Sequence, residues 1–109
     1  DLKQSTKQRF TAFDFDYPDA ALEARIVAGE SGLAEDTATR LVTVAQAARR
    51  LKGHGLTEGI STRLLVHAAQ LMQRGVDARD ACRMALVRPI TDDADIRDTL
   101  DHAVDACFA

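Results

Sequence analysis

Two arginines stand where a cation could meet an anionic group. Arg63 lies two residues after Ser61, which is a good N-cap for a helix over 62–74. Free backbone N–H groups and the positive end of the helix dipole meet at such a start, where a guanidinium can bind an anion bidentately. Arg9 directly precedes the strand-like segment 10–17, at a sheet edge where loops carry functional side chains. Spacing alone favours an ordinary surface role for both.

The other titratable residues favour structural roles. The acidic cluster Asp92, Asp93 and Asp95 lacks the spacing and the glycine of a calcium loop, and a helix start explains its charge. The three histidines have no spacing typical of a metal or general-base site; they are His54, His67 and His102. We therefore expect no metal site in this chain.

Cys82 and Cys107 are the only cysteines and lie at apolar positions of helical patterns. Neither belongs to a CxxC motif or a Cys/His cluster, so the sequence predicts two buried free thiols. Reduced thiols, and the lack of any recognisable signal peptide, lead us to expect a cytoplasmic protein.

The elements that must position these residues are mainly helical. Residues 10–17 alternate with a period of two, which predicts one β-strand, and a lone strand needs a partner sheet from outside this chain. Everything after Pro18 is expected to be helix, with a first helix that Gly32 ends. The later helices are expected over 35–52, 62–74, 78–87 and 92–108. The predicted fold is all-α, a small four- or five-helix bundle preceded by one strand of a missing core sheet.

Several details of these helices can be stated in advance. The first should bury a stripe of Leu22, Ile26 and Val27. Asp77 and Thr91 should cap the fourth and fifth. The second helix, over 35–52, should end in a basic turn that complements the helix dipole and consists of Arg49, Arg50 and Lys52.

Length and composition narrow the class of protein. The 109 residues allow one modest core, and the net charge of −3 argues against a nucleic-acid-binding domain. The middle of the chain is basic and its flanks are acidic, which fits either mutual neutralisation or a basic face for an anionic ligand. No apolar run approaches the 18 residues of a membrane span, so no membrane insertion is expected.

Three segments together resemble one protein family. The run Leu2-Lys3-Gln4-Ser5-Thr6-Lys7-Gln8-Arg9-Phe10, leading to Phe15-Asp16-Tyr17-Pro18, is similar to the segment that closes the core of MoxR-type AAA+ ATPases. Gly59-Ile60-Ser61-Thr62-Arg63 resembles the sensor-2 motif of their lid, and Arg88-Pro89-Ile90-Thr91-Asp92-Asp93 resembles the lid of the CbbQ/NorQ branch. The resemblance covers essentially the whole chain.

The resemblance implies that the chain is the C-terminal part of a longer ATPase. Residues 1–17 would be the end of the AAA+ core and 18–109 the helical lid that covers the nucleotide. Arg63 matches the sensor-2 arginine, which reaches the ATP phosphates, and Arg9 matches the arginine finger, which acts in trans. ATP and Mg²⁺ would be bound mainly by the missing core, so the chain alone should bind neither cofactor and should not hydrolyse ATP.

The resemblance also implies partners. These are the protein's own AAA+ core, the neighbouring subunits of a hexamer, a von Willebrand factor A-domain adaptor, and a client that is either Rubisco or a metalloenzyme, nitric oxide reductase. ATP hydrolysis would be coupled to remodelling or activation of that client. A different class of function remains open, a stand-alone helical protein-interaction module with no role in ATP chemistry. A DNA-binding helix-turn-helix is disfavoured by the acidic total.

Overall fold

The structure is a computed structural model that describes residues 17–56 and 59–108. Arg9 and the predicted strand 10–17 lie outside these residues, except for Tyr17, which belongs to no helix or strand. The regular elements of the described part are all helices, apart from one isolated bridge between Lys52 and Leu56, which confirms the all-α class. Its elements are α2 (Ala20–Ser31), α3 (Glu35–Arg50), α4 (Thr62–Gln73), α5 (Ala78–Cys82), the π-helical segment η1 (Arg83–Val87) and α6 (Ala94–Phe108). None of these helices combines the length and hydrophobicity that a membrane span requires.

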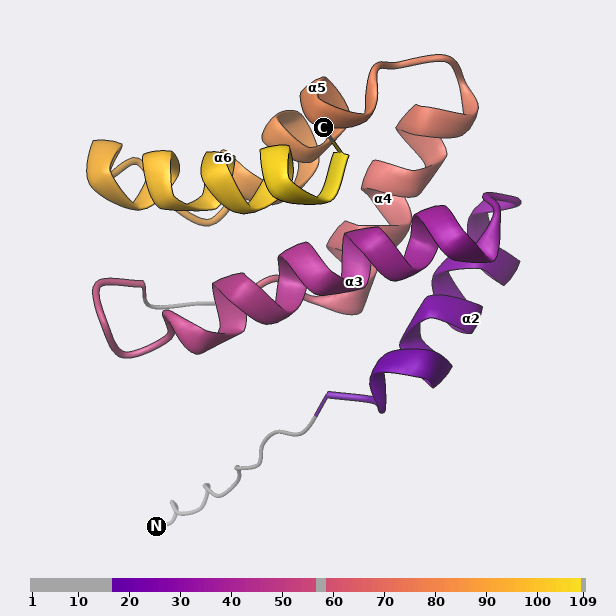
Figure 1. The fold of residues 1–109 in the computed structure, drawn as a ribbon, viewed down its shortest axis with the longest axis horizontal. Helices are drawn as coiled ribbons and strands as arrows, with labels where there is room; N and C mark the ends of the chain where they lie inside the picture. Colours follow the sequence, from indigo (N-terminus) through magenta and orange to yellow (C-terminus); the bar gives the residue numbers. More distant parts are fainter. Residues whose placement is uncertain (1–16, 57–58, 109) are drawn as a thin grey trace, which may run out of the picture.

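Helix α4 packs against α2, α3, α5 and η1. In Figure 1, α4 rises from behind α3 toward α5, α6 lies above α3, and α2 lies below the right-hand end of α3. The packing of α3 against α6 closes the bundle. The largest fully buried apolar side chains come from every part of it, and they are Val27, Leu41, Val42, Val44, Ile60, Leu65, Leu86, Val87, Leu100 and Val104. Burial of such side chains is the main force that holds the helices together.

Local signals placed most helix ends correctly. Gly32 ends α2 in the left-handed conformation, with φ of 82°. Ser61 caps α4 and accepts a hydrogen bond from the Leu64 N–H at 3.2 Å. Asp77 caps α5 through the N–H groups of the two residues that follow Ala78 in the first turn, Arg79 and Asp80. These caps confirm three of the predicted boundaries.

Two predicted helices differ in detail. Cys82 ends the α-helical part of the segment expected over 78–87, and the remainder is π-helical, where the N–H of Arg88 bonds to the carbonyl of Arg83 at 3.0 Å. The last helix begins at Ala94, and Thr91 does not cap it. The Asp93 carboxylate takes that place, because it accepts from the first-turn N–H groups of Asp95 at 2.9 Å and Ile96 at 3.1 Å.

The buried face of α2 was predicted correctly only in part. Val27 is buried as expected, but Leu22 and Ile26 are 44% and 37% exposed, so these two residues of the expected stripe do not face the core. The buried side chains of this helix are Val27, Ala24 and, unexpectedly, Glu23, which has no exposed surface. A buried carboxylate needs a partner of opposite charge, and that partner lies on α3.

Candidate functional site

Arg63 projects from the first turn of α4. Thr62 is the first residue of this helix and Ser61 its cap, so Arg63 occupies the second helical position. Its side chain is exposed, and no carboxylate among the described residues forms an ion pair with it. The helix start adds a positive dipole end to the guanidinium charge. The structure therefore places Arg63 in the first turn of a helix, as the sequence predicted.

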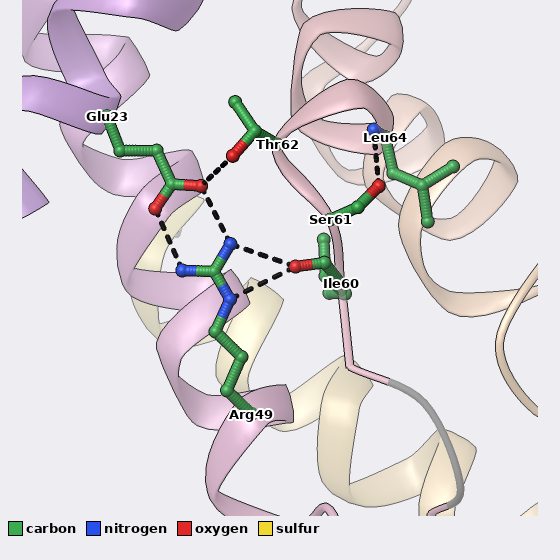
Figure 2. A network of polar contacts seen from close by, with 6 residues as sticks. All are labelled: Glu23, Arg49, Ile60, Ser61, Thr62 and Leu64. Atoms are coloured by element: carbon green, nitrogen blue, oxygen red, sulfur yellow. Dashed lines mark hydrogen bonds and ion pairs between the residues drawn. The ribbon is translucent and has the colours of Figure 1, made fainter. Parts of the chain in front are cut away.

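A buried ion pair lies directly beside this helix start. The Arg49 guanidinium of α3 binds the Glu23 carboxylate of α2 bidentately, with Nη1–Oε1 at 2.8 Å and Nη2–Oε2 at 2.7 Å (Figure 2). The Glu23 side chain is fully buried, and the Arg49 side chain is 11% exposed. Such parallel N–H···O contacts fix both side chains in one relative orientation.

Both members of the pair also bind the segment at the start of α4, Arg49 through a backbone carbonyl and Glu23 through a side chain. The Nε and Nη2 groups of Arg49 donate to the Ile60 carbonyl at 3.0 and 2.9 Å. The Thr62 hydroxyl donates to Glu23 Oε2 at 2.7 Å. Figure 2 shows how these contacts flank Ser61 on both sides. We call Glu23, Arg49, Ile60 and Thr62 the α4 clamp, since they join α2 and α3 to the residues that precede Arg63.

Tyr17 covers the clamp on the side where the described chain begins. The Cζ atom of Arg49 lies 3.6 Å from the centre of the Tyr17 ring, a cation–π contact. Gly59 allows this approach, because a Cβ there would lie 3.0 Å from the Tyr17 hydroxyl and 3.2 Å from Cγ of Arg49. The absence of a side chain at Gly59 thus allows this residue, Tyr17 and Arg49 of α3 to lie close together.

The clamp holds Glu23 in its charged form. Burial raises the pKa of Glu23, but the hydrogen bonds from Arg49 and Thr62, together with the Arg49 charge, lower it further than burial raises it. The net result is a pKa below the ordinary value of 4.5. Near neutral pH the Glu23 carboxylate is therefore ionised and pairs with the Arg49 guanidinium inside the protein.

These contacts change the interpretation of Arg49. The sequence led us to group it with Arg50 and Lys52 as a basic helix end that complements the dipole, yet its guanidinium turns inward to Glu23. The sequence did not single out Glu23 or Thr62, and it gave Arg49 only this helix-end role. A carboxylate between Leu22 and Ala24 was the available signal, but its partner lies 26 positions away.

The second cluster of charges is more exposed. Arg79 and Arg83 of the α5–η1 segment pair with Asp101 and Asp105 of α6 at 3.5 to 3.6 Å. These pairs and the Glu23 pair join three cations of the basic middle of the chain to its acidic flanks, so part of the uneven charge is neutralised within the fold. Exposed pairs of this kind contribute little to stability.

The two cysteines differ in their surroundings. Cys82 is buried, whereas Cys107 is half-buried, so the prediction of buried thiols is confirmed only for the first. Burial, with a smaller effect of the Cys107 thiol, raises the pKa of Cys82 to about 12. A thiol of that pKa is not a nucleophile near neutral pH.

Within residues 17–56 and 59–108, Arg63 is a cation without an ion pair at the start of α4. Arg49 is saturated by Glu23 and the Ile60 carbonyl, so it has little capacity left for a ligand. Arg63 remains available to bind an anionic group such as a phosphate. The described residues include no group of three or more His, Cys, Asp or Glu side chains that could hold a metal ion. The predicted partner arginine, Arg9, lies outside them.

The chain was compared with known proteins. The family model for the CbbQ/NirQ/NorQ C-terminal region matches residues 23–107. The protein CbbQ of Hydrogenophilus thermoluteolus is 58% identical over 109 residues, which are 100% of this chain and 41% of CbbQ. The denitrification regulatory protein NirQ of Pseudomonas aeruginosa is 59% identical over 92 residues, 84% of this chain and 35% of NirQ. The protein NorQ of Paracoccus denitrificans is 48% identical over 107 residues, 98% of this chain and 40% of NorQ.

The matches fit the resemblance carried by the three sequence segments. They extend through α2 to α6, and therefore through the α4 clamp and Arg63. The chain spans about two fifths of the length of the relatives CbbQ and NorQ. By the family model and the identities of 48 to 59%, the chain belongs to the CbbQ/NirQ/NorQ C-terminal family.

Proposed function

We propose that this chain is the lid of a AAA+ ATPase of the CbbQ/NorQ type, and that Arg63 binds the phosphates of ATP from this lid. The observation that carries the proposal is the position of Arg63, exposed and free of ion pairs among the described residues at the start of α4. Catalysis of phosphoryl transfer depends on positioning and on cations that stabilise the developing charge. A guanidinium on a rigid helix start meets both needs.

The remaining catalytic parts lie elsewhere in the full-length protein. ATP and Mg²⁺ are bound mainly by the AAA+ core, and the lid closes over them. Arg9 acts as the arginine finger in the site of the neighbouring subunit, which requires a ring, and the expected ring is a hexamer. The division of the chain into a core segment, 1–17, and a lid, 18–109, follows from these roles.

The energy of hydrolysis is used on a client protein. The proposed clients are Rubisco, which would be reactivated, and nitric oxide reductase, which would be matured, with a von Willebrand factor A-domain protein as adaptor. The protein acts in the cytoplasm, without nucleic acid and without insertion into a membrane. The relative NirQ is described as a denitrification regulatory protein, and this description supports nitric oxide reductase as one of the two proposed clients.

The test is steady-state ATP hydrolysis by the full-length protein with Arg63→Ala. A hydrogen bond to a charged group contributes about 1.5–3 kcal/mol, so we expect a loss of roughly 10- to 100-fold in kcat/KM. Arg74→Ala is the matched control, because Arg74 is also exposed but caps the opposite end of α4. Equal turnover by Arg63→Ala and the wild type would favour the alternative, a helical interaction module without a role in ATP chemistry.

A further inference from the structure

We infer that the α4 clamp positions Arg63, so that Glu23, Arg49 and Thr62 are positioning residues for the phosphate contact. The inference rests on the proposed function and adds residues that do not touch the nucleotide themselves. The segment just before Arg63 is held on two sides by a buried ion pair. Arg49 binds the Ile60 carbonyl, and Glu23 binds the Thr62 hydroxyl.

The two attachments restrict the residues next to Arg63. The Ile60 carbonyl is bound by two N–H groups of Arg49, and the side chain of Thr62 is bound by Glu23. Ser61, between them, is tied to the helix by its bond to the Leu64 N–H. A rotation of the backbone at 60–62 would break hydrogen bonds to charged groups, so the direction in which Arg63 leaves the helix is set from outside α4.

Burial makes these attachments costly to break. Glu23 and Ile60 have no exposed surface, and water cannot readily replace a lost partner there. An uncompensated charge in such a place is strongly unfavourable, and therefore the network has one arrangement. Helix α4 also packs on α2, the helix that carries Glu23, so its start cannot shift without moving that helix.

Arg49, in the α4 clamp, and Arg63 have different roles. The Arg49 charge is consumed by Glu23 and by the backbone, whereas Arg63 has no ion pair among the described residues. Arg49 therefore acts through the position of the helix start and Arg63 through its own charge. If this is so, the loss of a clamp contact should lower ATP turnover by no more than the loss of Arg63 itself does.

The least disruptive probe is Thr62→Val in the full-length protein. It keeps the shape of the side chain and removes only the hydroxyl that donates to Glu23. Thr62→Ser restores a hydroxyl and is the matched control. Both are made with Arg63 intact and with Arg63→Ala, and kcat/KM for ATP, the ATP affinity by calorimetry and the melting temperature are measured for each.

With Arg63 present, Thr62→Val should lower kcat/KM by roughly 2- to 10-fold, the effect of one hydrogen bond, and Thr62→Ser should recover most of it. In the Arg63→Ala background, Thr62→Val should cause no further loss, because the residue that it positions is gone. The ATP affinity gives the same comparison where turnover is too slow.

Two results would overturn the positioning role. One is wild-type turnover by Thr62→Val. The other is an equal loss from Thr62→Val in both backgrounds, as expected if the contact only stabilises the fold. If Arg63→Ala alone leaves turnover and ATP affinity unchanged, the proposed function itself fails, and the positioning role fails with it.

Discussion

The guanidinium of Arg49 and the carboxylate of Glu23 form a bidentate, buried ion pair between α3 and α2, with N–O distances of 2.7 and 2.8 Å. The same two side chains bind the Ile60 carbonyl and the Thr62 hydroxyl at the start of α4. One charge pair thus fixes three helices relative to one another. It lies next to Arg63, on which the proposed function depends.

Removal of the Glu23 charge should destabilise the chain strongly. Glu23→Gln leaves Arg49 buried with no compensating charge, and the loss of one partner of a buried pair costs about 3–5 kcal/mol. Urea unfolding followed by circular dichroism measures this difference. Glu30→Gln is the matched control, because Glu30 is exposed on the same helix, and it should change the free energy of unfolding by less than about 0.5 kcal/mol. A Glu23→Gln effect as small as that of the control would show that the pair does not hold the helices together.

The contribution of Glu23 should also depend on pH. Its pKa is lowered in the folded state from the ordinary value of 4.5, so the unfolded chain takes up the proton first as the pH falls. The stabilisation is complete above pH 4.5 and is lost progressively as the pH falls below it toward the pKa of the folded state. The difference in unfolding free energy between the wild type and Glu23→Gln should be constant at about pH 6 to 8. It should become smaller as the solution is made acidic. A difference that grew in acid would contradict the assignment.

Two glycines should respond to alanine in opposite directions. At Gly59 the new Cβ would lie 3.0 Å from the Tyr17 hydroxyl and 3.2 Å from Cγ of Arg49, so Gly59→Ala should destabilise the chain by about 1–3 kcal/mol. At Gly29, within α2, the new Cβ would have no atom within 4 Å other than those of its chain neighbours and of the helix's own backbone, and Gly29→Ala should stabilise the chain by about 0.5–1 kcal/mol.

Tyrosine fluorescence reports the same contact directly, because Tyr17 is the only tyrosine and the chain has no tryptophan. Gly59→Ala should change the emission of the native state, since the ring lies on Arg49, whereas Gly29→Ala should leave it unchanged. Unaltered emission and stability in Gly59→Ala would mean that Tyr17 does not rest on Arg49.

Arg9→Ala should abolish ATP hydrolysis in the full-length ring but leave ATP binding nearly intact. An arginine finger contributes about 10³–10⁵ in rate, and it would act in the site of the neighbouring subunit. Mixing Arg9→Ala subunits with subunits that cannot bind nucleotide should restore part of the activity, because intact sites then meet intact fingers. Lys7→Ala, a nearby basic residue, is the control and should retain activity. No restoration at any mixing ratio would contradict action in trans.

The parts of the fold that follow local rules were predictable. The caps Ser61 and Asp77 and the stop at Gly32 depend only on nearby backbone groups, so their residue types suffice to place them. Asp93 and Thr91 compete within three residues for the start of α6, and hydrogen-bond geometry decides between them. The π-helical turns of η1 were missed because no residue type in 83–87 distinguishes them from an α-helix.

The candidate site was predictable only in its exposed part. Arg63 could be located because a cap precedes it. Glu23 and Arg49 could not be paired in advance, since 26 residues separate them and the contact exists only after α2 packs on α3. In that packing Glu23 is buried together with Val27, whereas Leu22 and Ile26, which were expected to be buried, stay exposed.

The most direct test of the central claim is the affinity of the full-length protein for ATP, measured by calorimetry with Arg63 intact and with Arg63→Ala. We expect Arg63→Ala to weaken ATP binding by roughly 10- to 100-fold, as for lost hydrogen bonds to a charged phosphate, while Arg74→Ala at the other end of α4 binds like the wild type. Equal ATP affinity in all three proteins would contradict a phosphate contact by Arg63 and remove this residue from the nucleotide site.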